Sequence, residues 1–138
     1  MTRSFVLLLL GLCVAGCEET LGYGSSIPEL RIFESTFRPG DTVRADLVNR
    51  SPRLVRPEGC GVALEQRTSE AWLTVVPEPQ LCAAGLNLLG GGSIVSHKLP
   101  LPDSLTNGVY RLREMIIFRG QPPASPIFSP TFRVIGGD

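Results

Sequence analysis

The sequence has few of the side chains that metal sites and hydrolytic active sites require. Its 138 residues include one histidine, His97, one tryptophan and four cysteines. A zinc site needs more ligands than one imidazole supplies. A catalytic triad would have to combine His97 with Ser93 or Ser96, which are close only in sequence, and the chain contains no G-x-S-x-G elbow. We therefore expect a protein that is not an enzyme and that holds neither metal nor cofactor, with His97 exposed on a strand.

The chain also lacks an excess of charge of either sign. It contains 13 basic and 13 acidic residues, and Lys98 is the single lysine among the basic ones. The arginines are scattered and alternate with acids, so that no long-range field would attract nucleic acid. The composition thus predicts no nucleic-acid partner. The composition alone does not identify any other class of partner.

No apolar run reaches the roughly 20 residues that a membrane-spanning helix needs. The longest run, residues 5–12, follows the basic Arg3 and precedes small residues, which is the order of a secretory signal. The run closes on Val14-Ala15-Gly16-Cys17. The alternative interpretation is an ordinary signal peptide that is cut elsewhere, with Cys17 incidental.

The residues from Val14 to Cys17 resemble the lipobox of bacterial lipoproteins. The resemblance implies that residues 1–16 are a signal peptide, that the chain is cut before Cys17, and that palmitate or a similar acyl chain is attached there. Residues 17–28 would then be the lipidated cysteine and a flexible tether rich in Gly and Ser. The protein would be exported and anchored in the cell envelope. Glu18 favours the periplasmic face of the outer membrane if the organism has two membranes.

Cys60 and Cys82 remain as a pair once Cys13 leaves with the signal and Cys17 carries lipid. In an oxidising compartment an even pair predicts a disulfide. The bridge would close a loop of about 20 residues and contribute roughly 3 kcal/mol in the chain-entropy model. A metal or redox site is the alternative, but the chain has no C-x-x-C motif.

Residues 29–136 show no helical period and instead predict about seven short strands. The residue pattern is clearest in 42–49, where Val43, Ala45 and Leu47 share one face. The other predicted strands are residues 30–37, 62–67, 71–76, 93–101, 109–118 and 128–135, with Pro130 marking an edge or a bulge in the last. Residues 62–67 and 71–76 should form a hairpin. Regular short strands with Gly and Pro turns predict an all-β sandwich or barrel.

Two features of residues 105–118 refine this prediction. Leu105-x-x-Gly108-x-Tyr110 has the spacing of a tyrosine corner, in which the tyrosine hydroxyl bonds an upstream backbone group. Alternation from Tyr110 places position 114 inside, yet position 114 is glutamate. Because the unpaired burial of a charge is costly, we expect a bulge near Glu114 that exposes its carboxylate and turns Met115 and Ile117 inward. The alternative is a buried carboxylate paired with an arginine.

The ordered segments together resemble the bacterial Ig-like domains of small exported lipoproteins. The matching segments are Arg38-Pro39-Gly40-Asp41-Thr42-Val43, Leu47-Val48-Asn49, Leu64-Glu65-Gln66-Arg67 with Trp72, Leu101-Pro102, Gly108-Val109-Tyr110-Arg111-Leu112 and Ser129-Pro130-Thr131-Phe132-Arg133-Val134. The resemblance implies an Ig-like antiparallel sandwich and brings no catalytic residues with it. The Cys60 and Cys82 pair is no fixed part of that pattern, and we expect it to staple a loop.

Two functions remain open. The first is a monomeric, membrane-tethered module that binds an unidentified protein or envelope component through loops or an edge strand. The second is a protease inhibitor that acts through residues 120–126, a proline-rich segment expected to be a stiff, exposed loop. Other motifs predict less. We expect residues 90–93 to form a flexible loop, Asn49-Arg50-Ser51 to be an unused glycosylation sequon, and Trp72 to be a lid on the core.

Overall fold

The computed structural model describes residues 27–79 and 88–136 and contains only strands, turns and loops there. Within these ranges no helix is long and apolar enough to cross a membrane. The strands are β1 (Glu29–Ile32), β2 (Thr36–Phe37), β3 (Thr42–Val48), β4 (Val55–Pro57), β5 (Ala63–Arg67), β6 (Trp72–Val76), β7 (Ile94–Pro100), β8 (Gly108–Phe118), β9 (Gln121–Phe128) and β10 (Phe132–Val134).

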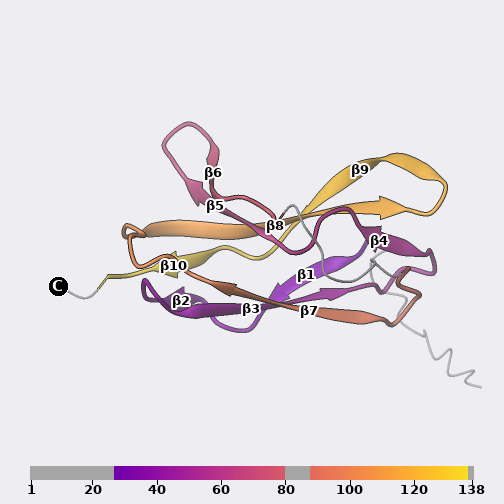
Figure 1. Ribbon diagram of the computed structural model, residues 1–138, viewed down its shortest axis with the longest axis horizontal. Coiled ribbons are helices and arrows are strands. Elements are labelled where there is room, and N and C mark those ends of the chain that lie inside the picture. The colour runs from indigo at the N-terminus through magenta and orange to yellow at the C-terminus, as the bar shows by residue number, and fades with distance from the viewer. Residues whose placement is uncertain (1–26, 80–87, 137–138) are drawn as a thin grey trace, which may run out of the picture.

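The strands form two sheets that face one another. The smaller sheet has the order β1-β3-β7, and the larger has the order β2-β10-β8-β5-β6, with β4 and β9 also paired to β8. In Figure 1, β5, β6, β8 and β9 lie above β1, β3 and β7. All pairs are antiparallel except β10 with β2. This order matches the A-B-E and C-F-G sheets of the immunoglobulin architecture, which confirms the predicted all-β, Ig-like sandwich.

Alternation of apolar and polar residues explains why β3 forms the centre of the smaller sheet. Val43, Ala45 and Leu47 are buried, whereas Thr42 and Arg44 are exposed, as the residue pattern predicts. β3 pairs with β7 along its whole length and with β1 over its second half. The inward side chains of β3 therefore supply one wall of the core.

The core lies between the sheets and is closed at one end by Tyr110. This side chain is fully buried, and its ring stacks on Phe132, which in turn meets Phe37 edge-on at 5.1 Å. The Tyr110 hydroxyl donates a hydrogen bond of 2.7 Å to the carbonyl of Thr106. The predicted tyrosine corner is thus confirmed, and it satisfies the one polar atom that the ring carries into the core.

The described residues contain ten strands and not about seven, because one predicted strand is divided and because β4 and β9 are additional. The segment 30–37 splits into β1 and β2, which belong to different sheets. The predicted strand 128–135 is shortened to β10, because β9 ends at Phe128, just before Pro130; β9 and β10 both pair with β8. At this break the Leu112 N–H donates to the Ser129 hydroxyl, and the Ser129 N–H donates to the Leu112 carbonyl. A serine thus maintains the ladder where proline interrupts it.

A similar interruption separates β4 from β5. Both strands pair with β8 on the same side, and residues 58–62 bridge the gap between them. The residue pattern does not predict β4, whose three residues are too short to show a period. The predicted hairpin of β5 and β6 is confirmed, with Arg67 opposite Trp72.

The prediction that residues 120–126 form a loop is wrong, although most of these residues are exposed as expected. Gln121 to Pro126 belong to β9 and pair with β8. Proline is typical of loops, but an edge strand accepts it where the missing N–H faces solvent or where the ladder is irregular, and the ladder of β8 and β9 is irregular between Ile116 and Phe118. The segment is therefore a strand of the sheet, not the protruding loop on which the inhibitor hypothesis depends.

Candidate functional site

A polar pair connects the two sheets inside the core. Val95, His97 and Leu99 alternate inward on β7. On β8 the inward position 114 carries a glutamate that is fully buried. The His97 Nε2 atom lies 3.1 Å from Glu114 Oε1, and the histidine side chain is 13% exposed. The two side chains thus form a buried hydrogen-bonded pair across the sandwich.

This pair overturns two predictions. Tyr110, Leu112, Glu114 and Ile116 alternate inward without interruption, so no bulge turns Glu114 outward. The register shift of β8 against β9 lies later, between Ile116 and Phe118. Glu114 is a buried carboxylate, as in the alternative, but its partner is a histidine of the other sheet and not an arginine. His97 is accordingly half-buried, not an exposed strand residue.

The surroundings of Glu114 are acidic. The atom Oε2 of Glu114 is buried and accepts no hydrogen bond from the described residues. Burial raises the pKa of the nearby Glu78, and the charges of Glu114 and Glu58 raise it further while Arg113 opposes them. Gly59 leaves room for Glu78, because a Cβ there would lie 2.7 Å from its Oε2. In the described part of the chain no group of three His, Cys, Asp or Glu could hold a metal ion.

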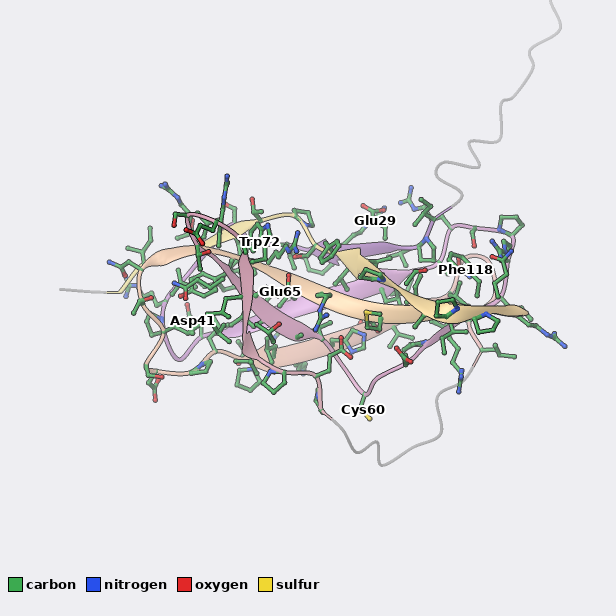
Figure 2. The ribbon with its side chains drawn as sticks, turned by 90° about the horizontal axis from the view of Figure 1, so that it is seen from above. Glu29, Asp41, Cys60, Glu65, Trp72 and Phe118 are labelled. Atoms are coloured by element: carbon green, nitrogen blue, oxygen red, sulfur yellow. The ribbon has the colours of Figure 1, made fainter. Side chains whose placement is uncertain are left out.

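The outer face of the larger sheet carries an arginine between two aromatic rings. The guanidinium carbon of Arg111 lies 4.2 Å from the ring centroid of Trp72 and 3.8 Å from that of Phe128. Arg111 Nε and Nη2 each approach Glu65 Oε2 at 2.8 Å, and Arg113 Nε lies 3.1 Å from Glu65 Oε1. Four neighbouring strands thus contribute to one cluster. Figure 2, which looks down on this sheet, labels Trp72 and Glu65.

We call Trp72, Arg111, Phe128, Glu65 and Arg113 the outer-face cluster. The prediction that Trp72 is a core lid is wrong, because its ring packs on Arg111 outside the sandwich. Phe128 remains 41% exposed, and Trp72 is half-buried. Cation–π contacts and ion pairs hold both rings in place while part of their surface stays accessible. Alternation on β8 could have indicated that Arg111 points outward. Phe128 ends β9, whereas the sequence predicts it at the start of the strand 128–135, so its position beside Arg111 was not indicated.

An open groove of about 990 Å³ is lined by side chains of both charges. Its lining comes mainly from β3, β7 and the β1–β2 link, and comprises Phe33, Glu34, Phe37, Asp41, Thr42, Arg44, Asp46, Ser96, His97 and Lys98. Ser96 Oγ donates to Asp46 Oδ1 at 2.6 Å, whereas the side chain of the next residue, His97, points to Glu114 in the core. The two therefore lie on opposite faces of β7, and the structure does not bring them together as nucleophile and base.

The remaining sequence candidates have structural roles or lie outside the described residues. Residues 90–93 form a turn before β7, closed by the Ser93 N–H on the Gly90 carbonyl. Asn49 is fully buried, and its amide donates to the carbonyls of Arg53 and Leu89. Cys60 lies between β4 and β5. Its expected partner Cys82 and the expected lipid site Cys17 lie outside the described residues, so both assignments stay predictions.

Comparison with known proteins leaves the family open. No family model matches the chain, and no curated protein matches it. Among solved structures, a family 123 glycoside hydrolase from Clostridium perfringens aligns with 74% of this chain and 23% of its own length, at 10% identity and TM-score 0.42. The chain thus spans about a quarter of that protein. The human CEP192 PapD-like domain 7 aligns with 100% of this chain and 99% of its own length, at 13% identity and TM-score 0.34. At these scores neither similarity supports a functional argument.

The His97–Glu114 pair yields a test of what the core tolerates. Replacing His97 by leucine leaves a buried carboxylate without its partner, and breaking such a pair costs about 3 kcal/mol. Replacing both residues by leucine removes the uncompensated charge, and we expect most of the lost stability to return. Urea unfolding at neutral pH measures both variants. A double variant as unstable as the single one would contradict this account.

Glu78 yields a test of pH dependence. Because its pKa is raised, the folded protein binds this proton at a higher pH than the unfolded chain does. Ionised Glu78 is therefore unfavourable at neutral pH, and its protonation stabilises the fold as the pH falls toward the ordinary value of 4.5. The variant Glu78→Gln should lose this gain, so that its stability advantage over wild type at neutral pH shrinks on acidification. Urea unfolding at several pH values measures the difference, with Glu70→Gln as an exposed-carboxylate control. An advantage that grows on acidification would refute the assignment.

Proposed function

We propose that this chain is an exported lipoprotein, anchored at Cys17, whose Ig-like domain is a non-catalytic module that binds a protein or an envelope component. The signal-like order of residues 1–16 and the small residues before Cys17 support the anchor. With a second membrane present, the protein would face the periplasm from the outer membrane. The inhibitor hypothesis has lost its support, because residues 121–126 lie in β9.

The outer-face cluster is the observation that supports binding best. Tryptophan and arginine are the residues that most often dominate the energetics of protein interfaces. Here Arg111 holds the rings of Trp72 and Phe128 on either side of itself, and Glu65 fixes the guanidinium. Rings that are already ordered lose little conformational freedom when a partner covers them. The cluster is thus a preformed, partly exposed anchor on a rigid sheet.

The anchor is tested by mass spectrometry of the mature protein. The N-terminal tryptic peptide should extend from Cys17 to Arg31 and carry added acyl mass. The variant Cys17→Ser should leave the membrane fraction. An unmodified peptide that begins elsewhere would refute the lipoprotein assignment and leave the assignment of the binding face untouched.

The binding face is tested by capture from crosslinked cells, with wild-type and variant proteins as bait. Trp72→Ala or Phe128→Ala should reduce recovery of the specific partner at least about tenfold, as truncation of an interface hot spot does. Phe33→Ala is the matched control, since Phe33 is 68% exposed and lies between β1 and β2, away from the cluster. Thermal melting verifies that each variant is folded. Recovery that falls only for Phe33→Ala would place the binding surface elsewhere.

A further inference from the structure

The edges of the two sheets differ in how they are protected against pairing with another strand. Natural edge strands carry charged residues or proline, or are very short. β1 has Glu29 and Arg31, β7 has Lys98 and Pro100, β2 has two residues, and β9 contains Pro122, Pro123 and Pro126. β6 reads Trp-Leu-Thr-Val-Val and has neither charge nor proline. β6 is thus the unprotected edge among these strands.

The hairpin register shows which backbone groups of β6 are available. The Thr68 N–H donates to the Ala71 carbonyl at 2.8 Å, so these two residues form a hydrogen-bonded pair. Such pairs alternate along an antiparallel ladder. The N–H and C=O groups of Leu73 therefore point toward Gln66 of β5, whereas those of Trp72 and Thr74 point away from β5. No strand of the described residues pairs with β6 on that side. A register shift opposite Leu64 and Glu65 ends the regular edge after Thr74.

We infer that this edge pairs with the same edge of a second copy of the chain. In an antiparallel arrangement centred on Leu73, Trp72 of each copy faces Thr74 of the other. Their free N–H and C=O groups then form four backbone hydrogen bonds. Leu73, which is 57% exposed, meets its own counterpart at the two-fold axis. Figure 1 shows the β5–β6 hairpin standing out from the sandwich, which leaves this edge accessible.

Self-complementarity favours a second copy over an unrelated strand. In this register the exposed Leu73 is covered by an equal side chain, and an aromatic residue faces a β-branched one, a favourable cross-strand pair. The residues that would pair, Trp72 to Thr74, carry no charge, so no like charges oppose one another. A second copy thus provides a suitable partner for Leu73 on one face of β6 and for Trp72 and Thr74 on the other.

The contact is small, and this determines when it forms. The contact consists of four backbone hydrogen bonds and one leucine pair. The surface area that it buries is therefore well below the roughly 1,200 Å² that stable interfaces bury. The domain should therefore be monomeric in dilute solution, and copies should pair where a common surface raises their effective concentration toward the millimolar range. Pairing in the cell thus rests on the proposed lipid anchor, whereas the geometry of the edge does not.

The test traps the pair through its central residue. Opposed residues at a non-hydrogen-bonded position lie about 4.5 Å apart at Cα, within disulfide range. The mature chain with Cys17→Ser and Leu73→Cys is attached by an N-terminal histidine tag to nickel-lipid vesicles and mildly oxidised. We expect disulfide-linked dimers at least about tenfold above the level of the same protein free in solution. Because the tether is artificial, the result does not depend on whether Cys17 is acylated in the cell.

Matched variants separate strand pairing from chance collision. Ser96→Cys in place of Leu73→Cys puts the thiol on the exposed face of β7 and gives the background. Adding Thr74→Pro removes a free-edge N–H without removing a bond to β5 and should abolish the dimers. If the Thr74→Pro variant has a lowered melting temperature, Thr74→Lys replaces it, because a lysine on an edge strand also opposes pairing with another strand.

Two results would overturn the inference. Crosslinking of the Leu73→Cys variant no greater than that of the Ser96→Cys variant, or dimers that persist with both Thr74 substitutions, would rule out edge pairing. Linkage of the Leu73→Cys variant in cells to a different protein, with no dimer, would assign the edge to a partner strand instead.

Discussion

The strict alternation of β8 is the constraint on which the rest of the molecule depends. Every other strand of the larger sheet except β2 and β6 pairs with β8. Its inward residues Tyr110, Leu112 and Ile116 fill the core, and its outward Arg111 and Arg113 engage Glu65. Because side chains on a strand change face at every residue, a shift of one residue would exchange these two sets. The core and the outer-face cluster are therefore positioned by the same strand.

The same alternation accounts for an acidic side chain that lies buried between the two sheets. Glu114 points inward because its position on β8 requires it, and His97 of β7 provides the hydrogen bond that makes this tolerable. An uncompensated buried charge would be far more costly than a paired one. The pair thus joins the two sheets at one defined register, whereas apolar contacts between them are not directional.

Residues whose neighbours are close in sequence were predictable. The alternation of β3, the hairpin of β5 and β6, and the corner made by Tyr110 and Thr106 all depend on spacings of a few residues. The pairing of Glu114 was not predictable, because its partner lies 17 residues away on the other sheet. β9 was not predictable because its prolines are typical of loops, and only its place at a sheet edge permits them. Without β9, the contact of Phe128 with Arg111 could not be predicted either.

Trp72 is the single tryptophan of the chain, and its ring lies against a guanidinium outside the core. Its fluorescence therefore reports on the hairpin and the outer face of the larger sheet, while Tyr110 reports on the packed interior. A denaturation curve followed by tryptophan emission would show the opening of β6, and a curve followed by circular dichroism would show the loss of both sheets. The molecule thus carries separate optical probes for its surface and its core, and their agreement or divergence measures how cooperatively the hairpin is attached.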